Sequence, residues 1–457
     1  MAEFSKPKKF SNLRAISSID GRFRGNIEKY SNYFSEFALM RHRVEVEIKY
    51  LITFLDYLEE IQLTETEKQK LKGIYLSFSE KDAQWIQDKD FVINHDTKSV
   101  EYFINEKLNQ LQLELDHFVH IGLTSADVDN NALVLSIKRF EIEVLSNLRK
   151  DIISCLESFA EKNQESIFLA KTHGKSAVPT TMAKEAENFL CRLRKIDGHI
   201  KEHNFEGKLS GAVGNFNALY AAYPEKDWKA FSKDFIKSLG LRPNLYTTQI
   251  LAYDNIIQYL NLVALFNSIL IDLARDFWFY TSFGLLSLEF NRAEVGSSTM
   301  PHKVNPISFE GAEAYLLLSN NLMSFFSAEL TTNRLQRDLT DKYISREVGV
   351  SLVQAALGVT MIAGGLNSVM FNAAAAEAEM DQHWEILAEA MQTILRKEGF
   401  LESYEKIKSL TMGRSLNRIE FLSIINEMQG VPDDIKDNLR RLSPRKYLGW
   451  AQTLQDK

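Results

Sequence analysis

The stretch that decides the fold is residues 254–287, DNIIQYLNLVALFNSILIDLARDFWFYTSFGLLS. Asp254 is suited to cap a helix, because an aspartate side chain accepts hydrogen bonds from the first helical N–H groups. The apolar side chains recur at helical spacing and cover more than one face; they include Ile257, Leu260, Leu262, Val263, Leu265, Phe266, Ile269, Leu270 and Leu273. The sequence predicts a helix from Asp254 to about residue 287, buried all round in a bundle that other copies of the chain can complete.

Proline is scarce, and its placement favours helices along the whole chain. Only eight prolines and 21 glycines occur in 457 residues, and none of the prolines lies within 8–178 or 307–431. Proline breaks helix interiors, so these gaps permit long helices, whereas a β-protein of this size needs many more turns. Apolar residues also repeat at helical spacing between residues 34 and 58. We predict an all-α fold of three helical domains, 1–122, 123–364 and 365–457, with the long-helix bundle in the middle.

The charge and composition favour an ordinary globular protein. Apolar residues make up 45% and charged residues 25% of the chain, and the net charge is −7. The only basic cluster near an end is residues 6–9, which is too short for the basic face that nucleic acid binding needs. We therefore expect no nucleic-acid partner.

The sequence also favours a reducing, water-filled compartment. Cys155 and Cys191 lack the spacing of a metal site or a disulfide framework. The first ten residues have no apolar signal core, and charged residues interrupt the apolar stretch 256–290. We predict a cytoplasmic protein without a membrane span.

The strongest chemical signal is residues 296–306, GSSTMPHKVNP. Glycine and adjacent serines give closely spaced N–H donors that suit an anion. Pro306 suits the first turn of a helix, so Lys303 and Asn305 are expected at a positive helix end. The plain alternative is a connector with a helix cap. If the segment is functional, it fits a carboxylate substrate.

This segment resembles the signature loop of the fumarase/aspartase superfamily, G-S-S-x-M-P-x-K-x-N-P. Members of that superfamily are helical enzymes that eliminate fumarate or a related acid from a succinyl-type substrate. The resemblance implies that Ser297 removes the proton beside a carboxylate, while Lys303 and Asn305 hold the carboxylate and its developing charge. Ser298 and Met300 belong to the same implied binding loop.

Three further motifs narrow the resemblance. Residues 171–174, KTHG, resemble the segment whose histidine, His173 here, is the general acid toward the leaving nitrogen, and Glu310 matches the carboxylate that orients it. Residues 120–127, HIGLTSAD, resemble a substrate-carboxylate loop; they also read as a helix N-cap. The resemblance implies substrate contacts from His120, Thr124 and Ser125.

The remaining motifs resemble the longer bacterial form of the adenylosuccinate lyase family. Asn94, His95 and Asp96 match its N-H-D segment near the leaving group or phosphate. Arginine suits phosphate because its planar fork donates two hydrogen bonds. The implied phosphate and nucleotide contacts are Arg22, Gln249, Arg337, Lys342 and Arg346. Departures from the family pattern are Phe23 in place of tyrosine, Lys175 and Ser176 in place of glutamine and proline, and Lys342 in place of serine.

The resemblance implies a complete reaction without a metal or an organic cofactor. Relatives act on two purine substrates and are homotetramers whose active sites are shared between subunits. Two alternatives stay open: another superfamily enzyme, such as a carboxymuconate cycloisomerase, or a non-catalytic scaffold. The phosphate-type arginines argue against the first alternative. Retention of the four residues that the resemblance makes catalytic argues against the second: Ser297, His173, Lys303 and Glu310.

Overall fold

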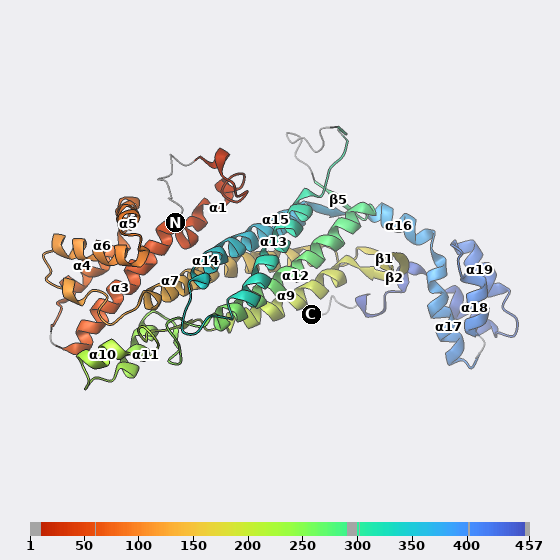
Figure 1. Cartoon of the computed structure of the whole chain (residues 1–457). Coiled ribbons are helices and arrows are strands. Elements are labelled where there is room, and N and C mark those ends of the chain that lie inside the picture. The colour runs from red at the N-terminus through yellow and green to blue at the C-terminus, as the bar shows by residue number, and fades with distance from the viewer. Residues whose placement is uncertain (1–10, 60, 290–298, 301, 401–402, 453–457) are drawn as a thin grey trace. The chain divides into compact units, whose positions relative to one another are not determined.

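The protein is mainly helical. The computed structural model describes residues 11–59, 61–289, 299–300, 302–400 and 403–452 (Figure 1). It confirms the predicted all-α class and adds small two-stranded sheets. These are the antiparallel pair β1 (Ile167–Thr172) and β2 (Lys175–Thr181), the parallel pair β3 (Glu206–Gly207) and β4 (Arg242–Pro243), and the antiparallel pair β5 (Leu286–Leu288) and β6 (Val369–Phe371).

The chain folds into two compact units, each made of three segments. Unit 1 comprises Met1–Arg149, Ile196–Ser268 and Ala314–Val359, and unit 2 comprises Lys150–Lys195, Ile269–Glu313 and Thr360–Lys457. The long helices that contribute residues to both units are α8 (Ser146–Lys162), α9 (Met182–Lys201), α12 (Asp254–Ser282), α13 (Ile307–Glu329) and α15 (Val348–Ser368). This division differs from the three domains expected from the sequence, whose boundaries near 122 and 364 stay a prediction.

In unit 1, the long helix α3 packs against α4 and α7. The predicted apolar stripe forms α3 from Glu36 onward, because Ser35 interrupts the helix and accepts a hydrogen bond from the Ala38 N–H at 3.1 Å. Besides parts of the long helices shared with unit 2, the α-helices of this unit are α1 (Arg24–Ile27), α2 (Ser31–Phe34), α3 (Glu36–Leu58), α4 (Glu65–Leu76), α5 (Glu80–Ile93), α6 (Asp96–Gln110), α7 (Ser125–Phe140), α10 (Asn217–Ala222), α11 (Trp228–Ser238) and α14 (Thr340–Ile344).

The decisive helix α12 begins at Asp254, as predicted, but ends at Ser282 instead of near 287. Gly284 adopts a left-handed conformation with φ +74°, and the Leu285 N–H donates to the Tyr280 carbonyl at 2.9 Å. This is the hydrogen-bond pattern of a glycine C-cap, which stops the helix. Residues 286 and 287, which were expected to be helical, instead belong to β5.

The prediction that α12 is buried all round is wrong for a single chain. Leu260, Leu270 and Leu273 are fully buried, but Leu265, Trp278 and Phe279 are 48%, 39% and 49% exposed. Apolar side chains on α13 are also exposed, among them Leu317, Leu318 and Phe325. The single chain therefore leaves large apolar side chains of both α12 and α13 uncovered.

Two helical stretches, Asp254–Ser282 and Thr340–Ser368, are long and apolar enough to cross a membrane. In their most apolar windows, 61% and 67% of the residues are buried inside the structure. Buried core helices of globular proteins have the same length and composition, so these stretches are weak evidence for a membrane.

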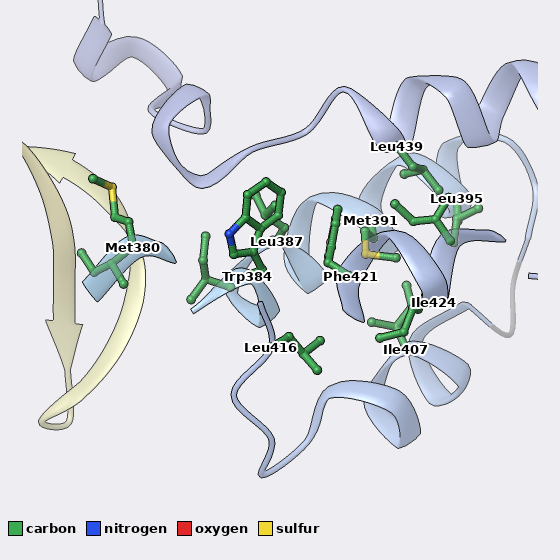
Figure 2. Close-up of a cluster of buried hydrophobic side chains, with 13 residues drawn as sticks. Met380, Trp384, Leu387, Met391, Leu395, Ile407, Leu416, Phe421, Ile424 and Leu439 are labelled. Carbon is green, nitrogen blue, oxygen red and sulfur yellow. The ribbon is translucent and has the colours of Figure 1, made fainter. Parts of the chain in front are cut away.

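Unit 2 has its own apolar core in the C-terminal part of the chain. Trp384, Leu387, Met391 and Phe421 lie at its centre (Figure 2), and the Trp384 and Phe421 rings are 5.5 Å apart. The helices around this core are α16 (Ala373–Asp381), α17 (Ala388–Lys397), α18 (Ser403–Thr411), α19 (Arg418–Asn426) and α20 (Asp433–Arg440). Leu169 of β1 contributes to the same core, which anchors the β1–β2 hairpin.

Candidate active site

The loop before α7 carries two hydroxyl residues to the start of the helix. Gly122 has φ +69°, and a Cβ there would lie 2.3 Å from the Leu219 side chain, so only glycine fits. The Tyr50 hydroxyl donates to the Ile121 carbonyl at 2.7 Å and fixes the loop. Thr124 and Ser125 are half-buried at the N-terminus of α7. The predicted N-cap is confirmed. The N-terminus of a 16-residue helix such as α7 carries partial positive charge, which favours binding of an anion.

His120 lies in the same loop and pairs with Glu47 of α3. The His120 Nδ1 and Glu47 Oε1 atoms are 2.6 Å apart, and the Glu47 side chain is 1% exposed. Burial alone would lower the pKa of His120, but the negative charges of Glu47, Glu101 and Asp127 outweigh it and raise that pKa. The loop therefore combines an imidazole of raised pKa with two hydroxyl residues.

The Asn94–Asp96 segment connects α5 to α6. Asn94 ends α5 with φ +53°, and the His95 Nδ1 accepts a hydrogen bond from the Lys98 N–H at 3.1 Å. Asp96 forms ion pairs with Arg43 at 2.9 Å and with Lys342 at 2.7 Å. Burial would raise the pKa of Asp96, but these two cations hold it well below its usual range.

The predicted phosphate-type residues border one small cavity in unit 1. Arg337, Lys342 and Arg346 lie in the lining of a cavity of about 90 Å³. Lys342, which stands where relatives have serine, binds Asp96 and lies 3.4 Å from Asp129. Arg346 is 43% exposed and is 3.4 Å from Asp96. Arg43, Lys342 and Arg346 thus pair with the half-buried Asp96 and Asp129. Arg346 also lies 3.2 Å from Glu36, so carboxylates as well as cations surround this cavity.

Gln249 connects the small-residue turn, residues 210–215, to Arg337. Its amide donates to the Ala212 carbonyl at 3.0 Å, and its carbonyl accepts from Arg337 Nη1 at 3.1 Å. A Cβ on Gly214 would lie 2.0 Å from the Thr247 carbonyl oxygen, so the small-residue turn packs directly on the segment before Gln249. The structure thus brings Gln249 and Arg337 together.

Arg22 is exposed. The neighbouring Phe23, where relatives have tyrosine, packs edge-on against Tyr315 with the ring centroids 5.1 Å apart. The Tyr315 hydroxyl lies 3.4 Å from Ser18 Oγ. A hydroxyl is therefore still present beside Phe23, although another residue supplies it.

In unit 2, His173 lies at the tip of the β1–β2 hairpin. Thr172 pairs with Lys175, and His173 and Gly174 form the two-residue turn with φ +52° and +72°. Two positive φ values are typical of the tight turns that match strand twist, and glycine and histidine tolerate them. Both residues are exposed, so the hairpin presents the imidazole to solvent.

The signature segment precedes α13 in unit 2. Ser297, Ser298 and Pro301 lie outside the described residues. Lys303 is exposed, Asn305 is half-buried, and α13 begins at Ile307, directly after Pro306. This confirms the expected position of Lys303 and Asn305 at a helix N-terminus. Met300 is 42% exposed.

Glu310 lies in the first turn of α13 and is exposed. Its carboxylate accepts a hydrogen bond from Trp278 Nε1 at 3.0 Å. Its expected role toward His173 therefore stays a prediction. Among the described residues, no group of three or more His, Cys, Asp and Glu side chains is placed to hold a metal ion.

Several residues that shape this site were not predicted as part of it. Arg43 and Glu47 are buried charged residues of α3, and Asp129 is a half-buried charged residue of α7. For Arg43 and Glu47, the sequence offered one signal, which is a charged residue within the otherwise apolar stretch that forms α3. For Asp129 the sequence offers no comparable signal, because its partners lie far away in the chain.

The sequence of the chain is similar to those of known lyases. Residues 11–317 match a family model described as Lyase, and residues 333–448 match one described as Adenylosuccinate lyase C-terminal. An adenylosuccinate lyase from Dictyostelium discoideum is 41% identical over 454 residues, covering 96% of this chain and 97% of the relative. An adenylosuccinate lyase from Escherichia coli (strain K12) is 36% identical over 452 residues, covering 98% and 99%.

Two solved structures share the fold. A fumarate lyase from Mesorhizobium sp. BNC1 matches with a TM-score of 0.77 at 17% identity, covering 93% of this chain and 96% of that one. A 3-carboxy-cis,cis-muconate lactonizing enzyme from Pseudomonas putida matches with a TM-score of 0.77 at 17% identity, covering 93% and 95%. At this identity the likeness concerns the fold alone.

Proposed function

We propose that this chain, which belongs to the adenylosuccinate lyase family and is a carbon–nitrogen lyase, releases fumarate from adenylosuccinate and leaves AMP. The observation that carries the proposal is the 36–41% identity to adenylosuccinate lyases over nearly the full length of both chains. By the same resemblance, the second substrate is SAICAR, which would give AICAR and fumarate. Both reactions belong to purine biosynthesis, toward AMP and IMP, and we place them in the cytoplasm.

In the proposed reaction, Ser297 removes the proton from the succinyl carbon next to a carboxylate. The carbon–nitrogen bond then breaks, its electron pair goes to nitrogen, and His173 supplies the proton that neutralises it. Glu310 would orient His173. The reaction needs no cofactor, because the base, the acid and the charge stabilisation all come from side chains.

Charge stabilisation is assigned to the two helix N-termini. Lys303 and Asn305 precede α13, and Thr124 and Ser125 begin α7. N–H groups at such ends are aimed at an anion before the reaction starts, which is how a site stabilises charge that develops on a carboxylate. His120, whose pKa is raised by Glu47, lies beside the second of these positions.

The nucleotide end is assigned to the cations of unit 1. Arg337, Lys342 and Arg346 border the cavity of about 90 Å³, and planar guanidinium groups suit a phosphate. Arg22, Gln249, Ser298, Met300, Asn94, His95 and Asp96 complete the proposed substrate contacts.

We also propose a homotetramer with active sites shared between subunits. The support is the uncovered apolar face of α12 and α13, where Leu265, Phe279, Leu318 and Phe325 are 46–50% exposed. Large apolar side chains that stay exposed on long helices favour burial against another chain. Analytical ultracentrifugation tests this part of the proposal, and a monomer at micromolar concentration would contradict it.

The catalytic proposal is tested by steady-state fumarate release from adenylosuccinate by wild type, Ser297→Ala and His173→Ala. Removing a general acid or base lowers kcat by roughly 10²–10⁴-fold. Ser77→Ala is a matched control, because Ser77 Oγ only donates to the Gly73 carbonyl at the end of α4. We expect normal turnover in the control and a large loss in both site variants. Full activity of Ser297→Ala would remove Ser297 from its role.

A further inference from the structure

A buried ion pair lies beneath the proposed substrate site in unit 1. Lys208 Nζ and Asp127 Oδ1 are 2.9 Å apart, and both side chains are 0% exposed. Burying two charges costs desolvation energy, and a well-packed apolar pair of the same volume is often as stable. The position of this pair between several loops therefore needs an explanation other than stability.

The Asp127 carboxylate joins the α7 loop to the small-residue turn that follows β3. Its Oδ2 atom accepts from the Thr124 N–H at 2.9 Å and from the Gly211 N–H at 3.1 Å. Its Oδ1 atom accepts from the Ser210 N–H at 3.0 Å. One carboxylate therefore fixes the distance between two loops that lie more than 80 residues apart in the chain, since residues 127 and 211 are 84 positions apart.

Lys208 extends this connection to a third segment. Its amino group donates to the Gln249 carbonyl as well as to Asp127. The side chain of Asn131 holds the pair from behind, donating to the Asp127 carbonyl and the Lys208 carbonyl, each at 2.7 Å. The side chain of Gln249 in turn contacts Arg337.

We propose that Asp127 and Lys208 are positioning residues, which hold the Thr124–Ser125 loop, the 210–215 turn and Gln249 in the arrangement that binds substrate. Neither side chain can touch substrate, because both are fully buried. Their effect is through the loops, and it rests on the proposed function. A shift of about 1 Å in such groups can lower a rate by roughly 100-fold.

The experiment uses the full chain with the double substitution Asp127→Asn and Lys208→Met. This double variant keeps the shape of both side chains and leaves no unpaired charge. In the wild type, both carboxylate oxygens of Asp127 accept hydrogen bonds from backbone N–H groups. An asparagine would turn its NH₂ group toward at least one of these donors and lose that hydrogen bond. Methionine in place of Lys208 cannot donate to the Gln249 carbonyl. The fold can therefore persist while the loops separate.

A second buried pair in unit 1 supplies the matched control. Arg149 binds Glu141 at 2.5 Å with side chains 4% and 9% exposed, and none of the proposed substrate residues contacts it. Glu141→Gln with Arg149→Met removes this pair, while Asp197 keeps its partner Lys201. Melting temperature and kcat/KM for adenylosuccinate are measured for both double variants and for wild type.

We expect the two double variants to lose similar thermal stability, but only Asp127→Asn/Lys208→Met to lose kcat/KM, by about 100-fold, with a raised KM. Equal kcat/KM per folded enzyme in both double variants would overturn the inference. Should the first variant not fold, Asn131→Ser, which keeps both charges, takes its place with the same two outcomes. An inactive wild type would overturn the proposed function as well, so the two failures are distinguishable.

Discussion

Replacing Glu47 by glutamine is expected to remove the positive charge of His120 near neutral pH. The two side chains are 2.6 Å apart, and Glu47 is nearly fully buried. A hydrogen bond to a charged group contributes about 1.5–3 kcal/mol, and Glu47→Gln removes the charge on the acceptor. The substitution should therefore lower the pKa of His120, because Glu47 is the main group that raises it.

The pH dependence follows from the direction of the pKa shift. The folded-state pKa of His120 is raised, so the pair contributes its full stability below the unfolded pKa of about 6.5. That contribution is lost as the pH rises through the folded-state pKa. Wild type should therefore lose stability relative to Glu47→Gln between slightly acidic and alkaline pH.

The assay is a double-mutant cycle of Glu47→Gln and His120→Gln. Urea midpoints are measured at pH 5.5 and pH 9 at one fixed protein concentration, because oligomer stability depends on concentration. We expect a coupling energy of about 1.5–3 kcal/mol at the lower pH and a much smaller one at the higher pH. A coupling energy that is the same at both pH values would refute the assignment of His120 as a cation.

Three further substitutions test other parts of the structure. Gly122→Ala places a Cβ 2.3 Å from Leu219 at a residue with φ +69°, so it should cost about 1–3 kcal/mol and lower the melting temperature. Asp96→Asn leaves Asp129 as the carboxylate partner of the buried Arg43, which should cost about 3 kcal/mol. Because the pKa of Asp96 is lowered in the folded protein, the wild type should be more stable than the variant above pH 4 and should lose this advantage as the pH falls further. Urea midpoints measured across this pH range check the prediction. Gly284→Ala introduces a side chain at φ +74° in the C-cap of α12 and should cost about 1 kcal/mol, measured by thermal unfolding, with Gly73→Ala, where a Cβ meets nothing within 4 Å, as the control.

The sequence predicted what depends on local patterns. The start of α12 at Asp254 and the helix that begins after Pro306 follow from caps and periodicity. The end of α12 was wrong by five residues, because the apolar pattern continues through Gly284 into β5. Apolar periodicity alone does not separate the last turn of a buried helix from a short buried strand.

The candidate site was predictable in its motifs but not in its connections. The Thr124 cap was visible because Asp127 lies three residues later. Lys208, the second partner of Asp127, is 81 positions away in the chain, and no local sequence pattern predicts that contact. The same holds for Lys342, which the sequence suggested as a phosphate ligand and which the structure pairs with Asp96 at 2.7 Å. Long-range charge pairing is decided by packing, which sequence periodicity does not encode.

The most direct test of the central claim is to incubate purified wild-type protein with adenylosuccinate and with its dephosphorylated analogue, succinyladenosine, and to measure fumarate, AMP and adenosine. The proposal predicts equal amounts of fumarate and AMP from adenylosuccinate, and a kcat/KM at least tenfold lower for succinyladenosine, since the Arg337 and Arg346 contacts to phosphate would be lost. A folded protein that releases no fumarate from adenylosuccinate would contradict the account.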